Sequence, residues 1–161
     1  SMKNLEELLM HELKDMYDAE HQLVAALTKM EQAATANTLK KAFEAHREQT
    51  KMHIERLNEV FALMQAKPER ETCDGMKGLI KEANKVLEEQ MDADVRDAAL
   101  IASAQRAEHY EMAGYGTMRT YARLLGHKQA AEILQQTLDE EGATDEKLTE
   151  LAQKINRSAK S

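Results

Sequence analysis

The sequence predicts an all-α protein, because helix-favouring residues dominate, helix-breaking residues are rare and apolar residues recur at helical spacing. Pro occurs once and Gly six times in 161 residues. A chain of this length can bury a substantial core, and we expect residues 1–161 to form one domain. Only 4% of residues are aromatic and Trp is absent. Leu, Ala, Ile and Met must therefore build the core, which gives little support to a haem or nucleotide pocket.

Two long helices are expected in the first half of the chain. The first spans about residues 3–34, with the apolar stripe Leu5, Leu9, Met16, Leu23, Leu27 and Met30. The turn at residues 35–38 supplies side chains suited to capping the next helix. The stripe of that helix is Leu39, Phe43, Thr50, Ile54, Leu57 and Phe61. It should end near Gln65, because Pro68 stands in a charged segment without helical periodicity.

A shorter helix and two more long helices are expected in the second half. Apolar residues between Cys73 and Leu87 predict a connector helix of about four turns. The third long helix should run from residues 92–94 to Leu125, with Gly126 as its C-cap. The fourth should run from about residue 130 to 155, leaving residues 158–161 as a frayed tail. The leading Ser1-Met2 is interpreted as a tag remnant.

The loop lengths limit how these helices connect. Short turns join the first and the last pair of long helices, which should form antiparallel hairpins, whereas about thirty residues separate the second long helix from the third. Two hairpins joined by a crossover that carries a short extra helix are typical of a ferritin-like antiparallel four-helix bundle. A weak internal repeat agrees with this, since residues 19–22 (Ala-Glu-His-Gln) resemble residues 107–110 (Ala-Glu-His-Tyr).

Charge and cysteine content exclude several classes of protein. The formal net charge is −7, which argues against binding to a nucleic-acid backbone. Cys73 is the only cysteine, so no intramolecular disulfide can form and a cytoplasmic location is expected. No apolar run approaches the roughly 20 residues that span a bilayer, so no membrane association is expected.

Polar side chains on the apolar stripes are the main departure from an ordinary helical bundle. Glu20, for example, lies four residues after Met16 and three before Leu23, inside its stripe. Similar spacings turn further polar groups toward the core, with Gln49 and His53 at the edge of their face. The candidate metal ligands are Glu20, His46, Gln49, His53, Glu108, Glu111, Glu141 and Asp145.

A set of this kind needs compensation for its charge. Burying one unpaired carboxylate costs several kcal/mol, against a total folding margin of roughly 5–15 kcal/mol. The stripes place no Arg or Lys at the same level, so bound cations are the simplest compensation. Carboxylate with imidazole suits Fe, Mn or Zn. Bundles hold paired ions with Glu from two helices and Glu-x-x-His from the other two, a pattern that is incomplete here.

Other interpretations of these residues stay open. The glutamates could form a buried hydrogen-bond network with shifted pKa values and ordered water, and Asp145 could accept a hydrogen bond beside the ligands. His46 is either a ligand or a core histidine bonded to a carboxylate, whereas His53 is more typical of a satisfied edge residue. A neutral amide such as Gln49 is a poor ligand, so one metal position is expected to be weak, empty or bridged by water. Of residues 139–141, only the last is expected to face inward.

Six strings spread over almost the whole chain can be compared with known families. They are Tyr17-Asp18-Ala19-Glu20, His46-x-x-Gln49-Thr50, Arg96-Asp97-Ala98-Ala99-Leu100-Ile101, Glu108-His109-Tyr110-Glu111, Tyr115-Gly116-Thr117 and Glu140-Glu141-x-x-Thr144-Asp145-x-x-Leu148. They resemble the YciE/YciF family of ferritin-like bacterial stress proteins. The resemblance implies a small helical bundle, usually a homodimer, with a di-metal centre and no settled biochemical activity. The family motif commonly has Glu at the position of Gln49.

The sequence therefore predicts a bacterial stress-response protein with a di-iron or di-manganese centre, zinc being a third option, that consumes oxygen or peroxide or holds metal. The alternative is a non-catalytic structural or interaction bundle with a degenerate site, for which Gln49 is the main evidence. Protection of DNA, as in miniferritins, is disfavoured because the chain is acidic and lacks a basic tail. No catalytic residue is assigned.

Overall fold

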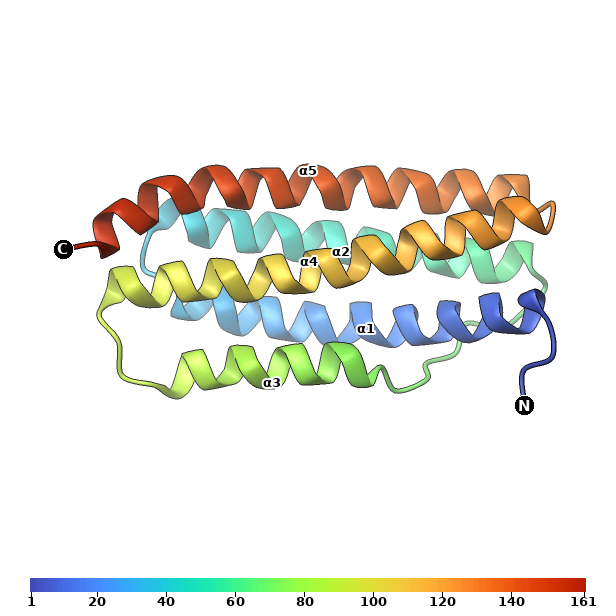
Figure 1. Cartoon of the computed structure of the whole chain (residues 1–161), viewed down its shortest axis with the longest axis horizontal. Helices are drawn as coiled ribbons and strands as arrows, with labels where there is room; N and C mark the ends of the chain where they lie inside the picture. Colours follow the sequence, from blue (N-terminus) through green and yellow to red (C-terminus); the bar gives the residue numbers. More distant parts are fainter.

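The computed structural model describes all 161 residues and contains helices and no strands. The helices are α1 (Leu5–Ala33), α2 (Asn37–Leu63), α3 (Asp74–Glu88), α4 (Ala93–Leu124) and α5 (Lys128–Ala159). Figure 1 shows the four long helices lying lengthwise beside one another, with α3 along the outside and the chain ends at opposite ends of the molecule. The prediction of an all-α fold is confirmed.

The long helices pack as two antiparallel hairpins. One hairpin consists of α1 and α2 and the other of α4 and α5, and the two meet through contacts of α1 with α4 and of α2 with α5. The short helix α3 packs on the outer side of α1 and α4. It lies within the connection between α2 and α4, where the sequence predicted a crossover helix (Figure 1).

The helix ends agree with the predicted ones except at the C-terminus. Gly126 has a φ of 85°, and the backbone N–H of His127 bonds to the carbonyl of Ala122, so α4 ends in the predicted glycine C-cap. The prediction of a frayed tail from residue 158 is wrong, because α5 continues to Ala159. Ile155 is 7% exposed and belongs to the core cluster, so the last turns of α5 still have an apolar contact to hold them.

The start of α2 is held by a residue of another helix. The predicted cap from residues 35–38 is wrong, since Ala36 occupies the N-cap position and makes no side-chain cap bond. Instead the carboxylate of Asp97, in α4, accepts the backbone N–H groups of Thr35 and Ala36, both at 2.8 Å. Asp97 is buried. The turn between α1 and α2 is therefore tied to α4 by two charge-assisted hydrogen bonds.

The loop before α3 is fastened to α1 in the same manner. Asp18 accepts the backbone N–H of Cys73 at 2.7 Å and the side chains of Arg70 at 2.9 Å and Gln22 at 2.6 Å. Burial would raise the pKa of Asp18, but these bonds lower it overall. Cys73 is itself fully buried, its Sγ lies 3.1 Å from the hydroxyl of Tyr110, and burial raises the pKa of the thiol. The lone cysteine thus has a packing role.

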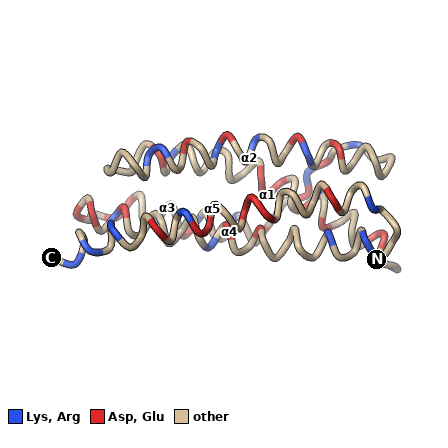
Figure 2. Tube along the Cα trace, turned by 90° about the horizontal axis from the view of Figure 1, so that it is seen from above, with Lys and Arg blue, Asp and Glu red and all other residues tan.

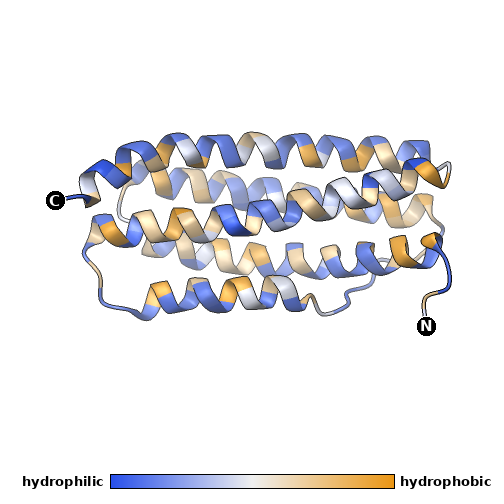
Figure 3. Ribbon diagram, in the orientation of Figure 1, coloured by the Kyte–Doolittle hydropathy of each residue, from blue (hydrophilic) through white to orange (hydrophobic).

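A polar layer interrupts the apolar core. Figure 3 shows orange, apolar stretches toward the ends of the long helices, while the middle of α4 is drawn mainly blue. Figure 2 shows Lys and Arg interspersed with Asp and Glu along the helices. No helix combines the length and apolar character that crossing a membrane requires.

The bridge made by Asp97 predicts a measurable stability loss. Replacing Asp97 by Ala should lower the free energy of unfolding in urea by about 2–4 kcal/mol, because two backbone N–H groups lose a charged acceptor. Asp94→Ala is the control, since Asp94 is exposed in the first turn of the same helix and should cost less than about 1 kcal/mol. Equal losses in the two variants would contradict the assignment.

Candidate metal centre

Six of the predicted ligands are buried together in the middle of the molecule. Each of the four long helices contributes at least one of them, and none is more than 3% exposed. They are Glu20 of α1, His46 and His53 of α2, Glu108 and Glu111 of α4, and Glu141 of α5. The stripe positions read from the sequence therefore do converge in space.

These side chains form two overlapping groups that share one carboxylate. The first group is His46, Glu108, Glu111 and Glu141, and the second is Glu20, His53 and Glu141. Within each group the candidate ligand atoms all lie within 4.8 Å of one another. Glu141 is the one residue that belongs to both groups.

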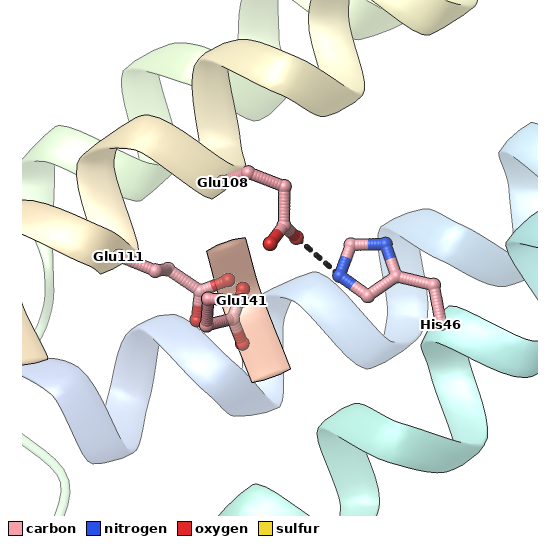
Figure 4. A group of neighbouring side chains, drawn as sticks. All are labelled: His46, Glu108, Glu111 and Glu141. Atoms are coloured by element: carbon pink, nitrogen blue, oxygen red, sulfur yellow. Dashed lines mark ion pairs between the residues drawn. The ribbon is translucent and has the colours of Figure 1, made fainter. Parts of the chain in front are cut away.

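The first group is drawn in Figure 4. Glu108 and Glu111 reach inward from successive turns of α4, because a spacing of three residues puts them on one face of that helix. The ring of His46 approaches from α2, with its Nε2 in contact with Oε1 of Glu108, and Glu141 enters from α5 (Figure 4). Three helices thus aim oxygen and nitrogen donors at a common point.

The second group surrounds His53. Its Nδ1 lies 2.7 Å from Oε1 of Glu141 and 3.5 Å from Oε2 of Glu20. Tyr115, fully buried in α4, donates its hydroxyl proton to Oε2 of Glu20 at 2.9 Å and so fixes that carboxylate. The expectation that His53 is an edge residue is wrong, since its side chain is 0% exposed.

Several polar atoms of the two groups have neither a hydrogen bond nor one of the histidine–carboxylate contacts described above. They are Oε1 of Glu20, Nδ1 of His46, both carboxylate oxygens of Glu111, and Oε2 of Glu108 and Glu141. A buried polar atom without a partner costs about 1–3 kcal/mol, and more if the group is charged. A carboxylate and imidazole set of this kind fits Fe, Mn or Zn, and bound cations would give the carboxylate oxygens and one nitrogen of each histidine a partner.

Burial and mutual proximity shift the pKa values of the groups that titrate. Burial raises the pKa of Glu108 to about 7 and that of Glu141 to about 8. Burial alone would lower the pKa of His53, but the carboxylates of Glu141 and Glu20 raise it to about 10. Burial lowers the pKa of His46, so its ring is neutral at physiological pH and can coordinate an ion without losing a proton.

Two predicted ligands lie outside both groups. Gln49 is half-buried, and its Oε1 accepts a hydrogen bond from the hydroxyl of Thr144 at 2.9 Å. Asp145 turns toward the surface groove between α4 and α5, where its Oδ2 lies 3.1 Å from Nε2 of the exposed His109. The spacing along α5 placed Asp145 on the apolar stripe, seven residues after Leu138 and three before Leu148, so periodicity alone could not show that its side chain turns away from the core.

Two residues that contact the site were missed by the sequence analysis. Glu140 was assigned to the solvated face of α5, but its Oε1 lies 3.0 Å from Nε2 of His53. Arg56 donates to both carboxylate oxygens of Glu140 at 2.8 Å, which lowers the pKa of that carboxyl. The spacing of Arg56 three residues after His53 was the available signal, since it places both on one side of α2.

The metal-free protein should lose stability as pH rises from about 5 to about 10. Folding raises the pKa values of Glu108 and Glu141 from 4.5 and that of His53 from 6.5. The folded state therefore binds more protons than the unfolded state across this window, so the free energy of unfolding falls with pH. Chelator-treated protein melted at a series of pH values tests this. Glu141→Gln should flatten the slope, and a melting temperature that increased between pH 6 and 9 would contradict the expectation.

Comparison with known proteins places the chain in a family. Residues 4–160 match a family described as a domain of unknown function, DUF892. The protein YciF of Escherichia coli strain K12 is 48% identical over 161 residues, covering 99% of this chain and 97% of that protein.

Solved structures agree with this relationship. The crystal structure of the Escherichia coli stress protein YciF superposes with a TM-score of 0.93 at 48% identity, covering 99% of this chain and 100% of that one. YcfI of Rhodopseudomonas palustris, for which a structural role has been suggested, gives 0.91 at 42% identity over 92% of this chain and 95% of its own. A Xanthomonas campestris protein that is 20% identical gives 0.77 over 96% and 95% and shares the fold. The chain therefore belongs to the DUF892 family and is a homologue of the stress protein YciF.

Proposed function

We propose that this chain is a ferritin-like stress-response protein whose two buried groups hold a pair of Fe or Mn ions. One ion would be held by His46, Glu108 and Glu111, and the other by Glu20 and His53. Glu141 would bridge them, since it is the member common to both groups. The chain's likeness to a stress protein supports the physiological setting.

The observation that carries this proposal is the set of unpartnered buried atoms around Glu141. A network of acids and histidines that served only packing would be expected to pair its donors with its acceptors. Here the carboxylate oxygens of Glu111 have neither a hydrogen bond nor an ion pair, and those of Glu108 and Glu141 meet only histidine nitrogens, although all are enclosed by protein. Cations coordinated at the centre account for every one of these atoms.

The chemistry proposed for the site is reduction of a small oxidant. Reduced Fe or Mn ions, if held by these residues, would supply the two electrons that, with two protons, are needed to reduce one peroxide molecule to two molecules of water. The protein's contribution is to hold neutral His46 as a ligand, to fix Glu20 through Tyr115 and to exclude bulk water. Enclosure also prevents reduced ions from reacting with larger molecules.

Access to the site favours small substrates. A pocket of about 110 Å³ lies between α2 and α5 and is lined by His46, Gln49 and Thr144 among others. A cavity of this volume is smaller than an engineered apolar cavity of about 150 Å³ that accepts benzene. Oxygen or peroxide fits it, whereas a molecule larger than benzene does not. We also propose a cytoplasmic location and a homodimer, as the family resemblance implies.

A second candidate function is a structural or interaction role without metal chemistry. The suggestion made for YcfI favours it, as does Gln49, whose amide bonds to Thr144 and leaves one fewer carboxylate for the site. In this case the central glutamates would be protonated in part, which their raised pKa values permit.

Metal analysis of variants separates these functions. Protein loaded anaerobically with Fe²⁺ or Mn²⁺ and measured by elemental analysis should contain two ions per chain. Glu20→Ala and His46→Ala should each remove about one ion, whereas Glu141→Ala should weaken both, because Glu141 is shared. Asp145→Ala is the control and should leave the content unchanged, since Asp145 lies outside both groups.

The rate of oxidant consumption then distinguishes a protein that reduces peroxide or oxygen from one that only stores metal. Iron-loaded protein should consume peroxide or oxygen faster than the Glu141→Ala variant and the free ion at the same concentration. Protein that takes up no metal and has the same melting temperature with and without Fe²⁺ or Mn²⁺ would refute the di-metal function and favour the structural one.

A further inference from the structure

We propose that Glu140 and Arg56 form a positioning pair that holds a proton on Nε2 of His53 and keeps its Nδ1 directed at Glu20 and Glu141 as the coordinating atom. This inference rests on the proposed function and adds to it two residues outside the ligand groups. It assigns a role to the carboxylate directly before Glu141 in the sequence.

The contacts of His53 give its two ring nitrogens different surroundings. Nε2 lies 3.0 Å from Oε1 of Glu140, whereas Nδ1 lies 2.7 Å from Oε1 of Glu141 and 3.5 Å from Oε2 of Glu20. The ring is fully buried, so no solvent molecule competes with Glu140 for Nε2 at the surface. The ring therefore lies between the central carboxylates on one side and Glu140 on the other.

Arg56 turns Glu140 into a fixed acceptor. Its guanidinium donates from two nitrogens to the two oxygens of Glu140, both at 2.8 Å, and one of these nitrogens also lies 3.3 Å from the hydroxyl of Thr137. Arginine keeps its charge at all physiological pH values and matches a carboxylate in this two-point geometry. Arg56 thereby balances the negative charge of Glu140. Glu140 is accordingly assigned to hold His53 and is not a third carboxylate ligand of the proposed ion there.

The protonation pattern of the ring follows from this geometry. An ionised carboxylate can only accept a hydrogen bond, so Nε2 must carry the proton that it shares with Glu140. A neutral imidazole has one protonated nitrogen and one with a free lone pair, and the lone pair is then on Nδ1. Histidine ligands of metals are commonly fixed through their other nitrogen in this way.

The other histidine of the site has no such support. Nδ1 of His46 is buried and has no hydrogen-bond partner, and its Nε2 contacts Glu108. Disrupting Glu140 should therefore weaken only the ion held by His53. This one-sided effect distinguishes a positioning pair from a general contribution of Glu140 to stability.

The test compares Glu140→Ala with the control Glu146→Ala. Glu146 lies on α5, is exposed and makes no ion pair or side-chain hydrogen bond. The probe is Zn²⁺ alone, which needs no redox partner, titrated into the full chain in competition with a chelator. In Glu140→Ala the affinity for one of two ions should fall about 10- to 100-fold, with the other unchanged. Glu140→Gln, which keeps an acceptor oxygen, should restore part of the loss, and Arg56→Gln should give a smaller loss in the same ion.

Nuclear magnetic resonance of the metal-free protein provides an independent measurement. The Nε2 proton of His53 should be visible and slow to exchange in the wild-type chain and in Glu146→Ala, and should be lost to exchange in Glu140→Ala. Circular dichroism melts identify any variant that fails to fold, for which Glu140→Gln is the substitute.

The possible outcomes separate the inference from the proposed function. A wild-type chain without a protected Nε2 proton, or a Glu140→Ala variant that binds both ions as tightly as wild type, overturns the positioning role. A wild-type chain that binds no Zn²⁺, Fe²⁺ or Mn²⁺ overturns the proposed function, and the Nε2 proton then decides by itself whether Glu140 holds the ring.

Discussion

Four glutamate carboxylates, those of Glu20, Glu108, Glu111 and Glu141, meet at the centre of the molecule, where none of them is exposed to water. Removing such groups from water costs several kcal/mol each unless opposite charge is supplied. The protein supplies only part of it, through His53, which retains its proton between Glu141 and Glu20 when no metal is present. Burial with this incomplete compensation raises the pKa values of Glu20, Glu108 and Glu141.

Two buried acidic residues elsewhere in the molecule have a purely structural role. Asp97 accepts two backbone N–H groups at the turn between α1 and α2, and Asp18 accepts three donors beside the loop that precedes α3. Both are buried, and both have their oxygens bonded. The oxygens of Glu111 are equally buried and have no hydrogen bond, and Glu108 contacts only His46. This difference supports the proposal that the central acids are metal ligands, because burial is common to both kinds.

The two histidines of α2 belong to different groups of the site. His46 and His53 are seven residues apart, which is about two helical turns, so they enter the site at different heights on one face. The first meets the carboxylates of α4, while the second meets Glu20 of α1, and Glu141 from α5 reaches both. Only His53 contacts a residue outside the two groups through its second ring nitrogen: Glu140 on α5, which is held in turn by Arg56 on α2. The two proposed ion positions therefore differ, because the histidine ring is fixed by a hydrogen-bonded carboxylate only at His53.

The sequence by itself determined the all-α class, the hairpins, the crossover helix and most of the buried ligands. Helical periodicity is a local property, and Glu20, Glu108, Glu111 and Glu141 lie well inside their stripes, so their direction follows from spacing alone. Residues at the margin of a stripe, and Asp145 within the stripe of α5, were different. The periodicity could not tell that His53 turns fully inward, that Asp145 turns to His109, or that Glu140 contacts the site.

Those positions were decided by tertiary structure, because a side chain at the edge of one helix points inward or outward according to which neighbour it meets. His53 and Glu140 face each other only when α2 and α5 pack side by side, and no spacing within one helix encodes that contact. The same holds for the turn before α2, whose backbone N–H groups bond to Asp97, about sixty residues further along the chain. Local periodicity gave the direction of the central acids, and the packing of helices distant in sequence decided which groups complete the site around them.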